Sequence, residues 1–482
     1  MELGHTEAEY RAQRLEHLKR LAAAGHAPFG GAFARDGNLA DIRASFQEGR
    51  RVRIAGRMLA RREMGKAVFA DLRDGTGRLQ IYLKRDELGD AAFDAFGWVD
   101  FGDFIGAEGE LFTTRTGEPS LKVRSWTLLA KALRAPPEKW HGLHDVEIRY
   151  RKRYLDLIAN PEVRDLFNKR IAIVRAIRDF LHGRGFQEVE TPMMQPMAGG
   201  AAATPFKTHY DALDCDMYLR IAPELYLKRL LVGGFDKIFE LNRNFRNEGL
   251  SRFHNPEFTM LEIYEAYGDR TTMQQLVQDL ICHAAQSVLG TLSVGTKDQP
   301  VDLTPPWRVV TYRDLITERM GSDWYSLSVD QMRARAITAG VHVDPAWGAF
   351  EITHEIFEKV IEKTLVNPTF VIELPAPLVP LAKLCPKDPS CVDVFELVIG
   401  GREIAPGYSE LNDPLEQRRR FEEQANGDPS KIDEDFLTAL EYGMPPAGGM
   451  GIGIDRLVML LCGAEAIRDV ILFPQMRPLA KG

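Results

Sequence analysis

The sequence has few cysteines and no long apolar run, and each absence excludes a class of protein. Its five cysteines in 482 residues form no C-x-x-C pair, which indicates free thiols in a reducing compartment rather than a disulfide scaffold or a zinc site. The N-terminal segment mixes charges and lacks the apolar core of a secretory signal, and the apolar stretch 457–464 is too short to span a bilayer. We therefore expect a cytoplasmic protein with no membrane partner.

Excess positive charge and a phosphate-binding loop are also missing. The net charge is −8, so any contact with nucleic acid has to come from a local basic patch. One candidate is RRVRIAGRMLARREMGK (50–66), although a solvated charged surface explains this segment equally well. No G-x-x-x-x-G-K-[ST] occurs, which argues against a P-loop nucleotide site.

Hydrophobic periodicity divides the chain into parts. Five short alternating segments between residues 50 and 130, separated by turns, predict a small β-barrel, with an OB fold favoured over an SH3-like barrel. Farther along, hairpin-paired strands flanked by helices predict an α+β domain with an antiparallel sheet, not a doubly wound one. The predicted parts are an N-terminal helical extension (1–48), the OB-fold domain (49–132), a linker (133–160) and the α+β domain (161–482).

The α+β part opens with a helix and a strand. Asn160 is a good N-cap and Pro161 suits the first helical position, and apolar residues including Ile171 keep helical period up to Gly183. The strand FQEVE (186–190) follows and ends before Pro192.

Polar residues recur at alternate positions of three predicted strands. Residues two apart in a strand share a face, so each such pair is expected to point the same way, with Leu261 and Ile263 pointing to the core. One pair alone is more often a surface salt bridge, but pairs on strands distant in sequence predict a polar active-site floor. The pairs are Arg246 with Glu248, Glu262 with Tyr264, and Tyr408 with Glu410.

A glycine-rich segment adds a second arginine. In GGMGIGIDRLVMLL (448–461), glycines allow close approach of the backbone, and Arg456 falls at the start of an apolar helix, where an anion is favoured. Glycines of an ordinary buried strand are the alternative explanation.

Three of these stretches together resemble a known family. GFQEVETPMM (185–194), FRNE…HNPEF (245–258) and GMGIGIDRLVML (449–460) resemble motifs one, two and three of the class II aminoacyl-tRNA synthetases, in that order. An OB-like domain precedes these motifs, and in this order of domains the chain resembles the subclass that charges lysine, aspartate and asparagine. The segments 217–249, GGREI (400–404) and YSELNDP (408–414) resemble the bacterial-type lysyl-tRNA synthetases, and the similarity runs from about residue 50 to the C-terminus.

The resemblance implies an enzyme that joins lysine to tRNA(Lys) with ATP and Mg²⁺, and a homodimer formed around motif one. Arg246 would bind the α-phosphate and the amino-acid carboxylate, and Arg456 would cover the adenine and meet the γ-phosphate, which makes these two arginines the catalytic residues. Glu396 and Glu403 would hold Mg²⁺. The remaining ATP contacts would be Glu248 to the adenine amino group, Phe258 stacked on the ring, and His254 at the outer phosphates.

The resemblance also implies an amino-acid site and an anticodon site. The buried ε-ammonium of lysine needs negative partners, whereas aspartate would need a cation, so Glu262 and Glu410 favour lysine on physical grounds too. The implied lysine site comprises Gly200, Glu224, Glu262, Tyr264, Tyr408 and Glu410. The implied anticodon readers are Phe69, by stacking, and Gln80 and Glu118, by hydrogen bonds to base edges.

Three positions depart from the family pattern and bear on the affinity for lysine. Pro406 stands where an asparagine is usual and removes an amide from the substrate's main-chain end. Thr204 replaces a basic residue, and Val379 replaces a serine.

Other functions within reach of this sequence are disfavoured by particular residues. Aspartyl- or asparaginyl-tRNA synthetase conflicts with Glu262 and Glu410. A paralogue that attaches an amino acid to a protein would usually lack the OB-fold domain. A catalytically inactive RNA-binding module would have little need of the combined ATP and metal residues, Arg246, Glu248, Glu396, Glu403 and Arg456.

Overall fold

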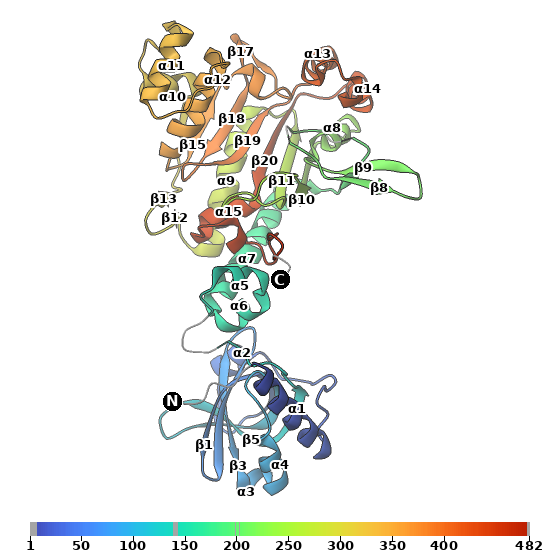
Figure 1. Cartoon of the computed structure of the whole chain (residues 1–482), viewed down its shortest axis with the longest axis vertical. Helices are drawn as coiled ribbons and strands as arrows, with labels where there is room; N and C mark the ends of the chain where they lie inside the picture. The colour runs from blue at the N-terminus through green and yellow to red at the C-terminus, as the bar shows by residue number, and fades with distance from the viewer. Residues whose placement is uncertain (1–6, 138–142, 198, 202, 480–482) are drawn as a thin grey trace. The chain divides into compact units, whose positions relative to one another are not determined.

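The computed structural model describes residues 7–137, 143–197, 199–201 and 203–479 (Figure 1). The chain divides into two compact units, Met1–Pro161 and Glu162–Gly482. Of the helices that the structure describes, none has both the length and the apolar composition that crossing a bilayer requires.

The first unit contains a closed five-stranded barrel. Its strands follow the order β1-β2-β3-β5-β4, in which β3 and β5 are parallel and the other neighbours are antiparallel, as in an OB fold. The five strands predicted from the alternating segments are thus confirmed. They are β1 (Arg51–Met64), β2 (Ala67–Arg73), β3 (Arg78–Lys84), β4 (Phe104–Thr113) and β5 (Pro119–Ala130).

Helices pack on this barrel and continue beyond it. Leu21 of the first helix and Leu39 and Ile42 of the second are buried with the barrel interior. Two short helices lie within the segment 133–160 expected as a linker, whose residues 138–142 are outside the described part. The helices are α1 (Glu7–Ala23), α2 (Leu39–Ala44), α3 (Arg85–Leu88), α4 (Asp90–Phe96), α5 (Val146–Arg151) and α6 (Arg153–Ala159).

The second unit is built on an eight-stranded, mostly antiparallel sheet, as expected for the α+β class. Its order is β14-β15-β18-β19-β20-β11-β10-β6, so the segments of motifs two and three lie side by side at its centre. The strands are β6 (Gln187–Glu188), β10 (Lys237–Phe245), β11 (Glu257–Ala266), β14 (Arg308–Thr311), β15 (Thr369–Ile372), β18 (Val394–Val398), β19 (Glu403–Ser409) and β20 (Ala447–Gly453).

Smaller sheets flank the large one. They form three separate groups, β12 with β13, β16 with β17, and β7-β9-β8. Their bounds are β7 (Met194–Gln195), β8 (Lys207–Tyr210), β9 (Cys215–Leu219), β12 (Ser293–Gly295), β13 (Pro300–Asp302), β16 (Leu384–Cys385) and β17 (Asp388–Val392).

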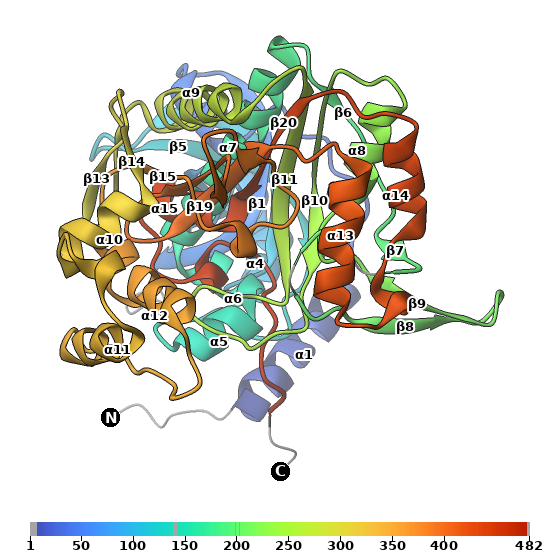
Figure 2. The same ribbon diagram turned by 90° about the horizontal axis from the view of Figure 1, so that it is seen from above.

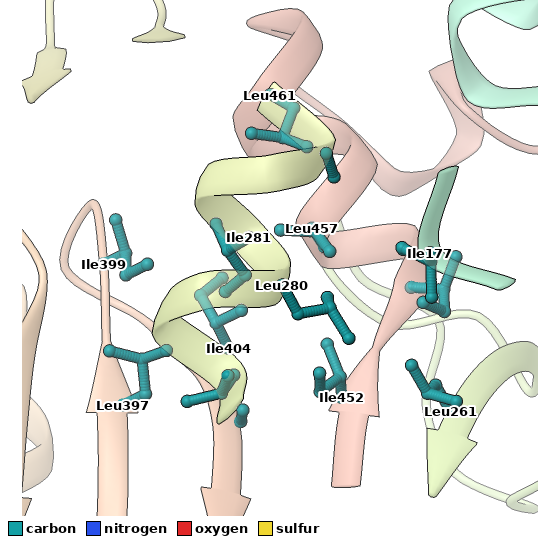
Figure 3. Close-up of a cluster of buried hydrophobic side chains, with 14 of the residues drawn as sticks. Ile177, Leu261, Leu280, Ile281, Leu397, Ile399, Ile404, Ile452, Leu457 and Leu461 are labelled. Atoms are coloured by element: carbon teal, nitrogen blue, oxygen red, sulfur yellow. The ribbon is translucent and has the colours of Figure 1, made fainter. Parts of the chain in front are cut away.

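One face of the large sheet is covered by apolar helices. Leu280 and Ile281 of α9 and Leu457 of α15 pack with Leu261 and Ile452 of the sheet in a single buried cluster (Figure 3). At the β10 side, α8, α13 and α14 lie close together (Figure 2). The helices are α7 (Pro161–Gly183), α8 (Glu224–Val232), α9 (Arg270–Leu289), α10 (Tyr312–Met320), α11 (Val329–Thr338), α12 (Ala349–Ile356), α13 (Pro414–Ala425), α14 (Glu434–Glu441) and α15 (Ile454–Cys462).

Single-turn elements complete the second unit. Five are 3₁₀ turns and η2 is a short π-helix that continues α12. They are η1 (Trp324–Ser326), η2 (Phe357–Ile361), η3 (Glu362–Thr364), η4 (Ala376–Leu378), η5 (Pro429–Lys431) and η6 (Ile467–Asp469).

The motif-one segment differs from its prediction in its strand. Helix α7 has the predicted bounds, but Ile171, which keeps its helical period, is 65% exposed in the single chain. The following strand is shorter than FQEVE, because only Gln187 and Glu188 pair with β10.

The alternation predicted for β11 is confirmed. Leu261 and Ile263 are fully buried in the core that α9 covers, while Glu262 and Tyr264 point to the opposite face.

The predicted strand pair Arg246 and Glu248 is wrong. Strand β10 ends at Phe245, opposite Glu257, and both charged residues lie in the connection to β11. The amide of Arg246 still donates to the Pro256 carbonyl, but Asn247 donates to the Thr204 carbonyl instead, so the two strands separate and open a cavity between them.

Candidate active site

The predicted ATP residues line one cavity of about 210 Å³ on the polar side of the sheet. They come from the β10–β11 connection, from β11 and from the first turn of α15, which the sheet order brings together. Glu403 and Pro406 of β19 line the same cavity. The predicted ATP residues found there are Arg246, Glu248, His254, Phe258 and Arg456.

Two arginines dominate this cavity. The guanidinium of Arg246 lies 5.2 Å from the centre of the Phe258 ring, and burial lowers the pKa of Arg246 against the opposing charges of Glu248 and other carboxylates. Arg456 donates to the Glu403 carbonyl at 3.2 Å and approaches Nε2 of His254 at 3.1 Å. A half-buried cationic site of this kind favours the phosphates of a nucleotide.

His254 is held as a neutral acceptor for Arg456. Burial and the charge of Arg456 lower the pKa of His254. Its Nδ1 lies 2.7 Å from the Ser251 hydroxyl, so a proton on Nδ1 leaves Nε2 free to accept from Arg456. The free protein thus pairs Arg456 with a weak, uncharged partner that an anion can replace.

Asp455, which the sequence reasoning did not single out, anchors Arg456. Its carboxylate accepts from the Thr259 amide at 2.7 Å and pairs with Arg170 of α7 at 2.7 Å. Motif three is therefore tied to both β11 and the motif-one helix. Its place beside Arg456 at the start of an apolar helix was the available signal.

Glu396 and Glu403 belong to a group of carboxylates whose negative charge is little offset by nearby positive charge. Burial and the charges of Glu403, Glu362 and Glu358 raise the pKa of Glu396 well above its usual range. Among the described residues no set of three or more acidic, histidine or cysteine side chains is placed to bind a metal unaided. Mg²⁺ normally takes one or two carboxylates plus substrate phosphates, so this excess negative charge beside a phosphate cavity fits Mg²⁺.

The predicted amino-acid residues gather farther along the same strands. The Tyr264 hydroxyl donates to Glu262 at 3.0 Å, and the Tyr408 hydroxyl donates to Glu224 at 2.8 Å. Glu262 is 6% exposed and Glu410 is fully buried. The structure therefore brings together the carboxylates and tyrosines that the sequence placed on separate segments.

A buried lysine that the sequence reasoning missed joins two of these carboxylates. The ammonium of Lys228 lies 2.7 Å from Glu224 and 2.5 Å from Glu410, and its own side chain has no exposed surface. The signal was present, since Glu224 and Lys228 are four apart on a helix with leucines around the lysine. Glu410 thus already has a cationic partner in the protein itself.

The carboxylates of this pocket are not fully satisfied by the protein. Burial, together with the charge of Glu224, raises the pKa of Glu262 to about 8 against the opposing hydrogen bond from Tyr264. Burial also raises the pKa of Glu410, although Lys228 opposes the rise. Oε1 of Glu410 is buried without a hydrogen-bond donor among the described residues. Such a site favours a ligand that brings positive charge.

Two glycines give the pocket its room. A Cβ on Gly449 would lie 1.8 Å from Oε1 of Glu410 and 2.6 Å from the Tyr264 ring. Gly200 has φ +84°, and a Cβ there would lie 3.2 Å from the Cβ of Glu224. Gly200 thus lies beside Glu224, as predicted for the α-amino end.

The three departures from the family pattern lie in different surroundings. Pro406 is opposite Glu396 in the β18–β19 pair and lines the cavity of the predicted ATP residues. The Thr204 carbonyl holds Asn247 of the motif-two connection at 2.8 Å, and its side chain is exposed. Val379 packs against the core under β15 and β18.

The predicted anticodon residues share one region of the barrel. The Phe69 ring stacks at an angle on Tyr82, with centroids 4.7 Å apart, and Gln80 accepts from Ser120 at 2.9 Å. Glu118 pairs with Arg43 at 3.0 Å. All three predicted side chains are half-buried, so each keeps a surface for an RNA base.

The basic segment 50–66 is only partly available for nucleic acid. Arg57 donates to the Gly102 carbonyl, and Arg61 donates to carbonyls of residues 96–99. These two arginines therefore serve the barrel itself.

Comparison with known proteins identifies both units. Residues 145–477 match the family described as tRNA synthetases class II (D, K and N), and residues 52–129 match the OB-fold nucleic acid binding domain. The chain is 52% identical to a lysine–tRNA ligase of Moorella thermoacetica over 98% of both chains. It is 47% identical to a lysine–tRNA ligase of Bacillus subtilis over 99% of both chains.

Proposed function

We propose that this chain, which belongs to the class II tRNA synthetases (D, K and N), activates L-lysine with ATP and transfers it to the 3′ end of tRNA(Lys), releasing AMP and pyrophosphate. It is an aminoacyl-tRNA ligase with a class II catalytic unit and an OB-fold unit. The predicted fold class and the family resemblance are confirmed.

One structural observation carries the proposal. On β11, Met260 lines the ATP cavity and Glu262 and Tyr264 follow at steps of two residues. On β19, Pro406 lines the same cavity and Tyr408 follows two residues later. Residues at steps of two share a face, so one continuous sheet face connects the nucleotide cavity to the carboxylate pocket. A bound lysine would have its carboxylate toward the phosphates and its ammonium groups among the glutamates.

The two arginines support the activation step. The lysine carboxylate attacks the α-phosphorus of ATP, and the bond to pyrophosphate breaks, giving lysyl-adenylate. Arg246 would hold the α-phosphate and offset the charge that develops on it, and Arg456 would hold the outer phosphates after leaving His254; both arginines line the same cavity, which supports these roles. Glu248 would bind adenine by a hydrogen bond and Phe258 by stacking, and both residues line the same cavity.

Glu396 and Glu403 are the residues that would hold Mg²⁺. When bound, Mg²⁺ offsets phosphate charge and aligns the outer phosphates. The raised pKa of Glu396, caused by burial and neighbouring carboxylates, supports this assignment because a divalent cation relieves that repulsion.

The amino-acid end and the barrel would supply specificity. Glu224 and Gly200 would hold the α-ammonium group, Tyr408 would pack along the aliphatic chain, and Glu262, Tyr264 and Glu410 would take the ε-ammonium group. Phe69, Gln80 and Glu118 would read the anticodon.

A homodimer is also proposed, formed around motif one. The 65% exposed Ile171 of α7 and the 54% exposed Met194 after it support an apolar surface there. Sedimentation should show a dimer. The interface of this dimer should bury more than about 1,000 Å². A monomer with full activity at the assay concentration would contradict it.

The five free cysteines agree with a cytoplasmic location.

Aminoacylation tests the function directly. The purified chain with ATP, Mg²⁺ and labelled lysine should convert tRNA(Lys) into an alkali-labile lysyl ester. The same reaction with tRNA(Asp) or tRNA(Asn) and their amino acids is the matched control. Charging of aspartate or asparagine at a rate equal to that of lysine would overturn the proposal.

A further inference from the structure

The amino-acid pocket contains a fixed cation that the proposed reaction leaves without a role. Lys228 comes from the first turns of α8, and its ammonium lies between Glu224 at 2.7 Å and Glu410 at 2.5 Å. Its Nζ also lies 5.7 Å from the centre of the Tyr408 ring. A fully buried ammonium is retained only where its partners offset the loss of hydration.

The charges of the pocket do not balance in the free protein. Glu224, Glu262 and Glu410 provide three carboxylates, and Lys228 provides one ammonium group in contact with them. The charge of Arg246 also acts on Glu262, but Arg246 lines the neighbouring cavity. The charge of Arg220 acts on Glu262 as well, but Arg220 is paired with Glu240 at 2.6 Å. A lysine substrate brings an α-ammonium and an ε-ammonium group. Three carboxylates would then meet three ammonium groups.

We propose that Lys228 is a positioning residue for lysine recognition, which acts through Glu224 and Glu410. The inference rests on the proposed function. By contacting both carboxylates, Lys228 fixes the α-ammonium end of the pocket relative to the ε-ammonium end. It also lowers the pKa of Glu410 against the effect of burial, so that Glu410 ionises more readily than it would without the ammonium group. With all three carboxylates ionised, the pocket lacks two positive charges, and an amino acid with two ammonium groups neutralises it.

Removing the fixed cation should change the protonation of the pocket. In Lys228→Met, three buried carboxylates would face each other without an ammonium group, and Glu410 would take up a proton in the free protein. Lysine binding would then have to expel that proton. The charged or titratable groups that face Glu410 and Lys228 are Glu224 on α8, Glu262 and Tyr264 on β11, Tyr408 on β19, and the half-buried Lys383 before β16.

Calorimetry of lysine binding in buffers of different ionisation enthalpy measures these protons. At pH 8.5 the unaltered protein should release only a fraction of a proton, because Glu262 and Glu410, both with a pKa raised to about 8 by burial, are then mostly ionised. Lys228→Met should release up to about one proton more at the same pH. The dissociation constant of Lys228→Met for lysine should rise about tenfold for each pH unit below the new pKa of Glu410. The KM for ATP should stay unchanged.

A matched control and a rescue variant make the test specific. Lys131 of the barrel is also a buried lysine between two carboxylates, so Lys131→Met should leave the proton count and lysine affinity unchanged. The double variant Lys228→Met/Glu410→Gln removes both members of the pair and should return the proton count to that of the unaltered protein.

Several results would overturn the inference. They are an unchanged proton count and lysine affinity in Lys228→Met, or equal losses of lysine and ATP affinity without extra proton release. If Lys228→Met does not fold, the double variant decides: an extra proton released by it, or its own failure to fold, contradicts the inference. If the unaltered protein binds another amino acid instead of lysine, the proposed function fails before any Lys228 variant is compared.

Discussion

Two buried lysines of this chain each lie between two carboxylates, yet their surroundings differ. In the barrel, Lys131 lies 2.5 Å from Asp100 and 2.7 Å from Asp103. In the catalytic unit, Lys228 lies 2.5 Å from Glu410 and 2.7 Å from Glu224. The ion-pair distances therefore do not distinguish a structural site from a binding site.

The difference lies in the remaining partners. In the barrel, His17 also pairs with Asp100 and the amide of Ala132 donates to Asp103. Although burial opposes it, Lys131 lowers the pKa of Asp100. In the catalytic unit, Oε1 of Glu410 has no donor among the described residues, and burial raises the pKa of Glu262 to about 8. The carboxylates around Lys131 have enough partners within the protein, whereas those around Lys228 lack positive charge. This difference indicates that the site around Lys228 is the one that binds a ligand.

The largest effect should come from closing the second site. In Gly449→Ala the new Cβ would lie 1.8 Å from Glu410, which displaces that carboxylate and the Tyr264 ring. We expect a loss of about 4–5 kcal/mol in kcat/KM for lysine in pyrophosphate exchange.

Gly451→Ala provides the contrast within the same strand. Its Cβ would meet only Met260 and Glu262 atoms, at 3.7 and 3.8 Å. We expect its Tm to change by less than about 2 °C. A Gly449→Ala variant that activates lysine normally would mean that Glu410 need not stay where the structure has it.

Removing one charge from each site should separate function from stability. Glu410→Gln should lose about 2–4 kcal/mol in kcat/KM for lysine with the KM for ATP nearly unchanged. Asp103→Asn, the corresponding change in the barrel, should instead lower the free energy of unfolding by about 1–3 kcal/mol and leave lysine activation intact. Equal effects of the two changes on lysine activation would contradict the comparison.

A substitution in the barrel should affect the reaction with tRNA but not the activation of lysine in the catalytic unit. Phe69→Ala removes a stacking surface of the barrel and should weaken tRNA charging by about 1–3 kcal/mol in kcat/KM. Lysine-dependent pyrophosphate exchange should not change. Equal losses in both assays would mean that Phe69 serves folding, where its ring packs on Tyr82.

The smallest effect concerns pH. Glu262 has a pKa raised to about 8 by burial and by Glu224, so it is mostly protonated at pH 7 and ionises as the pH rises. An ammonium group prefers the ionised form, so affinity for lysine should be lost as the pH falls through 8. The KM for lysine should decrease by up to about tenfold from pH 7 to pH 8.5. Glu262→Gln should abolish this dependence; persistence of the slope would assign it to another group.

Regular strands and the order of motifs could be predicted from the sequence. Alternation on β11 placed Leu261 and Ile263 in the core and Glu262 and Tyr264 in the site, because a strand has a fixed period of two. The barrel followed from the same rule applied to five segments.

The irregular and charge-dependent parts could not be predicted in this way. Arg246 and Glu248 were assigned to a strand, but their connection leaves the ladder after Phe245 to form a cavity, which periodicity does not encode. Lys228 was missed because a lysine in a helix usually faces water, and only the long-range approach of Glu410 makes burial tolerable. Ile171 keeps the helical period of α7 yet is exposed in the single chain, which periodicity alone does not reveal.

ATP–pyrophosphate exchange with each of the twenty amino acids tests the central claim most directly, that a pocket short of two positive charges selects an amino acid with two ammonium groups. Lysine should support exchange, and the other nineteen should do so at least about 100-fold less well in kcat/KM. Ornithine, added as a twenty-first substrate, keeps both ammonium groups but lacks one methylene, and should fall about 10–200-fold below lysine. Exchange with aspartate, asparagine or a neutral amino acid at a rate comparable with lysine would contradict the account.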